Sequence, residues 1–200
     1  MSARNNILKR IGQNKPGLKP LPFIELTAVS AYPDLVQQFS DTLAGIGGRA
    51  THGASMEGIS GIIDELSRPG IHVIVHPALR GMDTELAGEE ITLLAAMTTD
   101  QLEFVEHAFL RAELAVAENG SVWLYESQLG NRLLPFICQH LHVVVDKSRI
   151  VATMHQAYAQ IDPAREGYGL FLAGPSKTAD IEQSLVIGAH GARSLTVYLV

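Results

Sequence analysis

The sequence lacks the residues that a bound metal cluster or a disulfide framework would need. It contains a single cysteine, Cys138, in the apolar context Pro-Phe-Ile-Cys. One cysteine forms no disulfide within the chain and cannot supply the thiolates that hold an iron–sulfur cluster or a structural zinc ion. The chain also has no Gly-x-Gly-x-x-Gly dinucleotide fingerprint. Any redox centre with which this protein works is therefore expected on another molecule.

Long apolar runs and an apolar leader are also missing. No segment approaches the roughly 20 apolar residues of a membrane-spanning helix. The N-terminus, Met-Ser-Ala-Arg-Asn-Asn, lacks the apolar segment of a secretory signal, so we expect a cytoplasmic protein. With 46% hydrophobic and 18% charged residues, a chain of 200 residues can bury a full core.

Acidic residues are absent from the first 20 residues, which contain five basic ones. The rest of the chain has ten basic residues against 21 acidic ones, a net charge of −11. A basic arm on an acidic body can reach a second subunit, as in a homodimer, or an anionic partner, and a short solvated helix explains it equally well. The body's basic residues are scattered and not interleaved with aromatic ones, which argues against nucleic-acid binding.

Apolar spacing and turn residues predict the domain organisation. Residues 3–12 fit an amphipathic helix and residues 15–22 a Pro-rich tether, so residues 1–22 form a basic N-terminal arm and residues 23–200 one compact domain. Helices are predicted at 34–43 and 59–66, buried strands at 71–75 and 141–146, and a hairpin around Asn119-Gly120. Residues 81–94 give no clear pattern, and their acidic side chains are expected to face solvent.

The densest polar motif lies near the C-terminus. The apolar run that begins at Tyr168 leads into Gly174-Pro-Ser-Lys-Thr-Ala-Asp-Ile-Glu182, and Gly188-Ala-His-Gly191 follows. Apolar runs at 170–173 and 195–199 on either side of a predicted helix at 178–187 indicate a βαβ unit. The whole succession therefore predicts one α/β domain with a mostly parallel sheet flanked by helices and an inserted β-hairpin.

The predicted helix at 178–187 decides how its flanking polar residues are interpreted. Ser176 or Thr178 would cap it, and Asp180 and Glu182 would occupy its first turn at the positive end of the helix dipole. A helix of ten residues is about 15 Å long. The loop and the His190 turn are therefore expected at opposite ends. His190 would then contact the last helical carbonyls or reach a site built with another subunit.

The eight histidines suggest a metal site, but their spacing does not favour one. His140 and His142 would share a strand face, as would His72 and His76, because side chains two residues apart point the same way. His107 and His155 fall in predicted helices. None of these histidines has a carboxylate at ligand spacing. We therefore interpret them as structural and predict no metal site.

The polar motifs resemble those of the lactate utilisation protein C family. Its LUD domains carry a closely similar Gly-Pro-Ser-x-Thr-Ala-Asp-Ile-Glu run followed by His-Gly. The resemblance extends from about Ile7 to Val200 and implies a fold of the NagB/RpiA/CoA-transferase-like type. The family also has an arginine comparable to Arg132 before a His-containing strand. Its turn at Glu118–Ser121 usually has Thr where Asn119 stands.

The resemblance implies a non-cluster component of a system that oxidises L-lactate to pyruvate together with iron–sulfur partner proteins. This chain would bind no cofactor of its own, and its pocket would bind a small carboxylate or organise the partners. Arg132 would clamp the carboxylate, although a surface ion pair explains this residue as well. The predicted substrate-binding residues are Asn119, Gly120, Ser121, Arg132, Gly174, Ser176, Lys177, Thr178, Asp180 and Glu182, with His190 and Gly191 in a second site or interface.

Other functions remain open on the same scaffold. Ala117-Glu-Asn-Gly120 looks like the Ser-Glu-Asn-Gly turn of class I CoA-transferases, in which the glutamate attacks an acyl-thioester, so Glu118 is a candidate catalytic nucleophile. Phosphosugar chemistry is a further enzyme function for this fold, and a plain hairpin turn needs no function. An assembly factor without turnover is the third alternative. Analogy of fold does not decide among them.

Overall fold

The centre of the protein is a five-stranded sheet in which all neighbouring strands run parallel, in the order β1-β11-β6-β3-β2. The computed structural model describes residues 2–20, 22, 32–81, 84–178 and 186–200. The central strands are β1 (Arg49–His52), β2 (His72–Val75), β3 (Val105–Arg111), β6 (His140–Val145) and β11 (Ser194–Leu199). The predicted α/β class with a mostly parallel sheet is confirmed.

A second sheet of four strands has the order β7-β4-β5-β8. Its strands are β4 (Leu114–Val116), β5 (Ser121–Tyr125), β7 (Ile150–Val151) and β8 (Gly169–Leu172). Strands β4 and β5 pair antiparallel around Gly120, whose φ of +69° suits the tight turn, so the predicted hairpin is confirmed. Strand β8 pairs antiparallel with β5 and therefore belongs to this second sheet.

Two of the longer helices begin at a capping side chain. The Asp34 carboxylate accepts hydrogen bonds from the N–H groups of Val36 and Gln37, and the Ser55 hydroxyl accepts one from Gly58 N–H. The longer helices are α1 (Ala3–Gln13), α2 (Leu35–Gly45), α3 (Met56–Leu66), α4 (Thr84–Ala95) and α8 (Met154–Gln160). Shorter ones are α5 (Thr99–Leu102), α6 (Glu126–Leu129) and α7 (Leu134–Ile137), with 3₁₀ turns η2 (Pro77–Leu79) and η3 (Lys147–Arg149). Within the described residues no helix is long and apolar enough to cross a bilayer.

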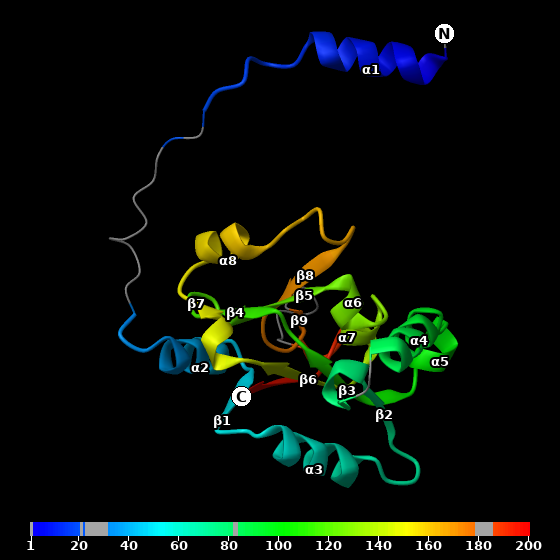
Figure 1. The fold of residues 1–200 in the computed structure, drawn as a ribbon, viewed down its shortest axis with the longest axis vertical. Coiled ribbons are helices and arrows are strands. Elements are labelled where there is room, and N and C mark those ends of the chain that lie inside the picture. Colours follow the sequence, from blue (N-terminus) through cyan, green and yellow to red (C-terminus); the bar gives the residue numbers. More distant parts are fainter. Residues whose placement is uncertain (1, 21, 23–31, 82–83, 179–185) are drawn as a thin grey trace.

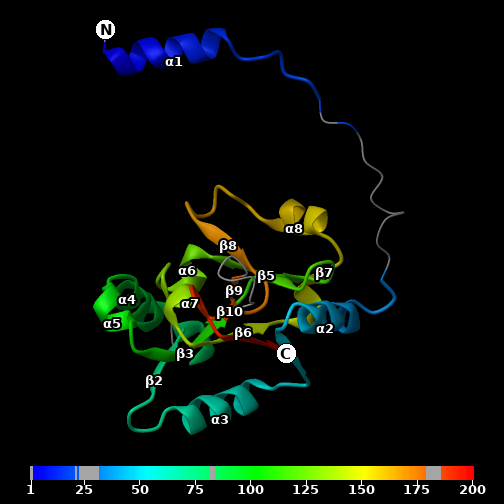
Figure 2. The ribbon, with the colours of Figure 1, turned by 180° about the vertical axis from the view of Figure 1, so that it is seen from behind.

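The two sheets and two of the helices form four layers. Figure 1 shows α3 on one side of the central sheet, the second sheet on the other side, and α8 beyond the second sheet. The same order is seen from behind in Figure 2. Three groups of buried side chains fill the spaces between these layers. The largest lies between the sheets, where Val143 and Val197 of the central sheet and Val122 and Leu124 of the second are fully buried.

The predicted helix at 178–187 is wrong at both of its described ends. Strand β9 (Lys177–Thr178) pairs antiparallel with β10 (Val186–Ile187), with Thr178 opposite Val186. Thr178, Val186 and Ile187 are all β-branched, and such side chains favour extended backbone over a helix. Since β8 and β11 lie in different sheets, the predicted βαβ unit is wrong as well. Residues 179–185, with Asp180 and Glu182, lie outside the described residues.

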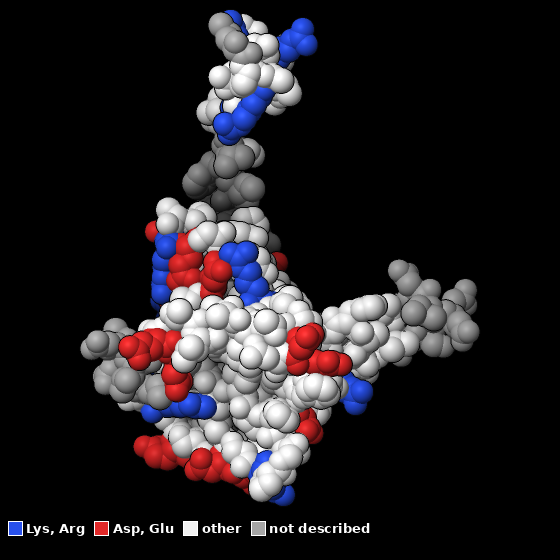
Figure 3. Space-filling view, turned by 90° about the vertical axis from the view of Figure 1, so that its right-hand side faces the viewer, with Lys and Arg blue, Asp and Glu red and all other residues white. Residues whose placement is uncertain are grey.

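Charged side chains on the surface are mixed in sign. On the face shown in Figure 3, small groups of acidic residues alternate with basic ones around an uncharged centre. Several arginines of the body pair with a carboxylate, and these are Arg68, Arg80, Arg132, Arg149 and Arg165. In α1, which belongs to the basic arm, no residue is buried.

The hairpin turn packs directly on the backbone of α2, and we expect this contact to be sensitive to one added methyl group. A Cβ at Gly120 would lie 2.9 Å from both the Cα and the N of Leu43. Gly53 has a similar φ, +66°, but nothing within 4 Å of its Cβ position. Left-handed backbone costs an L-residue about 1 kcal/mol, so Gly53→Ala should lower the free energy of unfolding by that amount.

Gly120→Ala should lower the free energy of unfolding by more than about 2 kcal/mol, because the turn must also move away from α2. Urea denaturation of the two variants measures the difference. Equal losses in the two variants would show that the turn and α2 are not in close contact.

Candidate functional site

The two most distinctive C-terminal motifs meet at one cavity. The loop after β8 and the turn before β11 line a space of about 250 Å³. Gly174 and Ser176 come from the loop, and His190 and Gly191 from the turn. Phe136, Leu141, Phe171 and Leu172 form the more apolar part of the wall. A small polar molecule placed here would meet the Ser176 hydroxyl and the His190 ring across an apolar floor.

Backbone hydrogen bonds hold the loop and the turn together. Ser176 N–H donates to the Ala192 carbonyl at 2.9 Å, and Gly188 N–H donates to the Ser176 carbonyl at 3.0 Å. The contact is close because residue 191 is glycine, since a Cβ there would lie 3.0 Å from Ser176 Cβ. The expectation that His190 lies a helix length away from this loop is therefore wrong. Strand β10 pairs antiparallel with β9 and so lies beside the loop, whereas a helix would have ended away from it.

The loop and the β4–β5 turn both lie against the C-terminal end of α2. A Cβ at Gly174 would be 2.9 Å from the Ile46 carbonyl oxygen, and Gly120 packs on Leu43. Lys177 Nζ would lie 3.1 Å from a Cβ at Gly47. This position places an ammonium near the partly negative end of the helix. The structure thus brings the predicted segments 118–121 and 174–177 to one place.

The polar groups of the β4–β5 turn are occupied by contacts within the chain. One oxygen of the exposed Glu118 carboxylate accepts a hydrogen bond from Met154 N–H at 2.8 Å, at the start of α8. Asn119 Oδ1 accepts from the Ser121 N–H at 3.1 Å and from its hydroxyl at 2.7 Å. These contacts account for the turn as a structural element. The assignment of these residues to catalysis or substrate binding stays a prediction.

Arg132 forms a surface ion pair. Its Nε donates to Glu126 Oε1 at 2.7 Å, and its guanidinium lies 4.6 Å from the centre of the Tyr168 ring. This hydrogen bond lowers the pKa of the Glu126 carboxyl. The described lining of the 250 Å³ cavity does not include Arg132. Its predicted role as a carboxylate clamp stays a prediction, and a ligand would have to compete with Glu126.

Three histidines share one face of the central sheet. His107 lies in β3, not in a helix as predicted, opposite His140 of β6 in the strand register. His107 Nδ1 and His142 Nε2 are 3.0 Å apart, and His142 Nδ1 is 3.2 Å from the Tyr198 hydroxyl. Burial, followed by the charges that His107 and His140 would carry, lowers the pKa of His142 to about 4. In the part of the chain that the structure describes, no three His, Cys, Asp or Glu side chains are arranged to hold a metal ion.

Two further buried groups are held in their neutral forms. His76 Nε2 donates to the Ser127 carbonyl at 2.7 Å, while its Nδ1 accepts from Ala78 N–H, and burial lowers its pKa. Burial raises the pKa of the Cys138 thiol to about 12, so at neutral pH it is no nucleophile. Both residues are structural in this arrangement.

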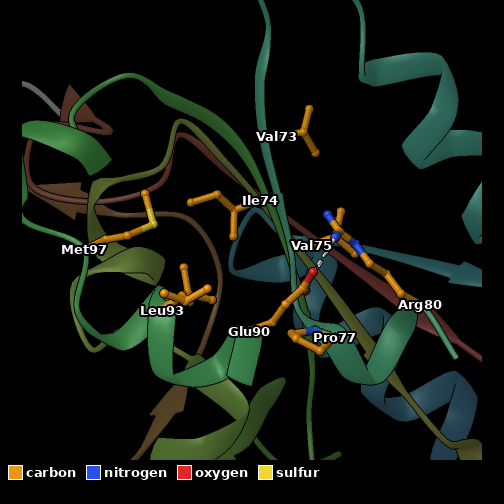
Figure 4. Close-up of a pocket in the computed structure, with 9 residues that line it drawn as sticks. Val73, Ile74, Val75, Pro77, Arg80, Glu90, Leu93 and Met97 are labelled. Atoms are coloured by element: carbon orange, nitrogen blue, oxygen red, sulfur yellow. Dashed lines mark hydrogen bonds and ion pairs between the residues drawn. The ribbon is translucent and has the colours of Figure 1, made fainter. Parts of the chain in front are cut away.

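A second cavity was not predicted from the sequence. It has a volume of about 300 Å³ and opens between the edge strand β2 and α4 (Figure 4). Ile74 of β2 lies on the side of Leu93 and Met97, and at the rim Arg80 and Glu90 lie 3.4 Å apart. Apart from the Arg80–Glu90 pair, the residues described along its wall are apolar, so polar chemistry suits the first cavity better. Sequence analysis missed it because residues 81–94 show no clear period.

Comparisons with known proteins agree with the motifs. A family model described as the LUD domain matches residues 36–200. Lactate utilization protein C of Geobacillus kaustophilus is 34% identical over 104 residues, or 49% of this chain and 43% of the relative. Lactate utilization protein C of Deinococcus radiodurans is 26% identical over 203 residues, or 99% of this chain and 95% of the relative. The match to the Geobacillus protein spans less than half of that relative's length.

A solved structure shows the same fold. The crystal structure of a DUF162 family protein from Deinococcus radiodurans superposes with a TM-score of 0.59 at 23% sequence identity. The superposition covers 83% of this chain and 96% of that one.

The histidine face should make stability depend on pH in a defined window. The folded-state pKa of His142, about 4, lies below the ordinary value of 6.5. Between these two pH values the unfolded chain binds a proton at this residue and the folded chain does not. Stability is therefore complete above about pH 6.5 and declines as pH falls toward 4, by an amount on the order of 2 kcal/mol at pH 5.

His142→Gln should remove most of that decline between pH 7 and pH 5 when unfolding is measured in urea. His155→Gln is the matched control, since His155 is exposed on α8, and it should keep the wild-type profile. If both variants retain the full decline, His142 is not the responsible group.

Proposed function

The chain belongs to the LUD domain family, and on that premise we propose that it acts in lactate utilisation. It would be the non-cluster component of a system that oxidises L-lactate to pyruvate with iron–sulfur partner proteins. One observation carries the proposal. The two motifs most specific to the resemblance are separated in sequence, yet both line a single cavity. They supply it with a serine hydroxyl and a histidine.

The chemistry of that cavity suits a small hydroxy acid. Ser176 and His190 can donate hydrogen bonds to carboxylate or hydroxyl oxygens, and Lys177 adds a positive charge next to the loop. The apolar wall at Phe136 and Leu172 would exclude water from one side of a three-carbon molecule. In this proposal the chain binds and orients the acid, and electrons pass to clusters held by the partner proteins.

The companion possibility of acyl transfer rests on Glu118 and has less support from the geometry. A nucleophilic carboxylate needs an oxygen directed at the thioester. Oε2 of Glu118 accepts a hydrogen bond from Met154 N–H at 2.8 Å, and its other oxygen lies on an exposed turn. The 250 Å³ cavity also has no described contribution from Glu118.

Reconstitution tests the proposal directly. The iron–sulfur partner proteins are assayed for L-lactate-dependent reduction of an artificial electron acceptor, with and without this chain. We expect most of the activity to disappear when the chain is omitted. Undiminished activity would contradict the proposal.

Point variants separate a ligand-binding role from pure assembly. Ser176→Ala removes a hydroxyl from the cavity but keeps the backbone hydrogen bond to Ala192, so we expect weaker lactate dependence, seen as a raised KM. Ser60→Ala, on the exposed surface of α3, is the matched control and should behave as wild type. A required chain whose Ser176→Ala variant has an unchanged KM would indicate an assembly factor.

Glu118→Gln tests the acyl-transfer alternative. The glutamine carbonyl can still accept the Met154 hydrogen bond, so the fold should persist while a carboxylate nucleophile is lost. We expect lactate-dependent activity of the reconstituted system to be unchanged. Loss of an acyl-CoA transfer activity in this variant would favour the transferase function instead.

A further inference from the structure

Aromatic residues are scarce in this chain, yet one cavity collects many of them. Its volume is about 270 Å³, and its wall contains the single tryptophan and three of the five tyrosines. Trp123 and Tyr125 belong to β5, Tyr158 belongs to α8, and Tyr168 precedes β8. The proposed lactate function does not use this cavity, which lies on the side of the second sheet that α8 covers.

The strand register builds the cavity. Trp123 pairs with Phe171 and Tyr125 with Gly169 across β5 and β8. A Cβ at residue 169 would lie 2.5 Å from Trp123 Cζ2, so the glycine leaves the space that the indole ring occupies. The Tyr125 hydroxyl accepts a hydrogen bond from Asp162 N–H at 3.0 Å, which ties the following loop to the strand. The aromatic wall is therefore formed without a ligand.

Positive charge borders this wall. The Arg165 guanidinium lies 4.3 Å from the centre of the Tyr125 ring, and the Arg132 guanidinium lies 4.6 Å from that of Tyr168. The carboxylate that lines the cavity, Glu166, already accepts two hydrogen bonds from Ser127, each 2.7 Å long. Both arginines also pair with carboxylates, Arg165 with Glu113 at 3.3 Å and Arg132 with Glu126 at 2.7 Å. The Nη2 group of each has no hydrogen-bond partner among the described residues, and these two groups are the donors left for an acidic substituent on a guest.

The size and the wall together define the guest. Aromatic side chains contact flat rings by stacking and edge-to-face packing, and the volume is small for a ligand pocket. We propose that this cavity binds a small planar aromatic acid, with one or two fused rings and a carboxylate or phosphate substituent.

The lone tryptophan provides a direct readout. Its indole N–H is buried and has no hydrogen-bond acceptor among the described residues. It should give one indole signal in a proton–nitrogen NMR spectrum of the full chain. Three probes test the aromatic ring and the negative charge separately. 2-Naphthoate has both, 2-naphthylmethylammonium has the ring with a positive charge, and cyclohexanecarboxylate has the negative charge without an aromatic ring. We expect 2-naphthoate to shift the indole signal saturably, with the other two binding at least roughly tenfold more weakly.

Variants locate the binding. Tyr158→Ala removes a ring that is 64% exposed, so the fold should tolerate it, and 2-naphthoate should bind about fivefold or more weakly. Tyr158→Phe keeps the ring and should bind as wild type. Phe104→Ala, which removes an aromatic ring that is 67% exposed elsewhere, is the matched control and should also bind as wild type.

Three results would overturn the proposal: no shift at millimolar 2-naphthoate, equal affinity for all three probes, or an unchanged affinity in Tyr158→Ala. None of them bears on the lactate assay, so the two proposals succeed or fail separately.

Discussion

The apolar layer between the two sheets is the constraint on which the other features depend. Along β6, Leu141, Val143 and Val145 point into this layer, while His140 and His142 point to the opposite face. Fully burying each such aliphatic side chain contributes roughly 2 kcal/mol. A slip of one residue would reverse the two faces and bury the histidines between the sheets. The same register fixes where each strand ends, and so where the loops that form the cavities begin.

Features that depend on a few neighbouring residues could be read from the sequence. The hairpin at Asn119-Gly120, the helix after Asp34 and the buried strand at 141–146 are of this kind, because turn, cap and period are local properties. Features that depend on pairing between distant segments could not. The pattern at 178–187 predicts a helix, but Thr178 pairs with Val186 in two short strands. His107 was predicted in a helix, but it lies in a strand because β3 pairs with both β2 and β6.

Part of the candidate site was predictable as residues but not as an arrangement, since the described lining of the cavity includes Ser176 and His190 but not Arg132. Composition alone marked the Gly174 loop and the His190 turn, yet their contact depends on the backbone bond between Ser176 and Ala192. The close approach of Gly120 to α2 likewise involves a helix far away in sequence. The aromatic cavity had one available signal, the concentration of Trp and Tyr between residues 123 and 168 in a chain poor in aromatics. Their shared wall follows only from the pairing of β5 with β8.

Cys138 has a consequence for how this molecule can be followed in solution. Its sulfur is buried against the core, and its thiol stays protonated at neutral pH. Alkylating reagents attack the thiolate, so the native chain should escape them, whereas an opened chain presents an ordinary cysteine. The chain has no second thiol. The fraction of molecules that carry one added label therefore gives the fraction that has opened, and the labelling rate reports how often a molecule opens.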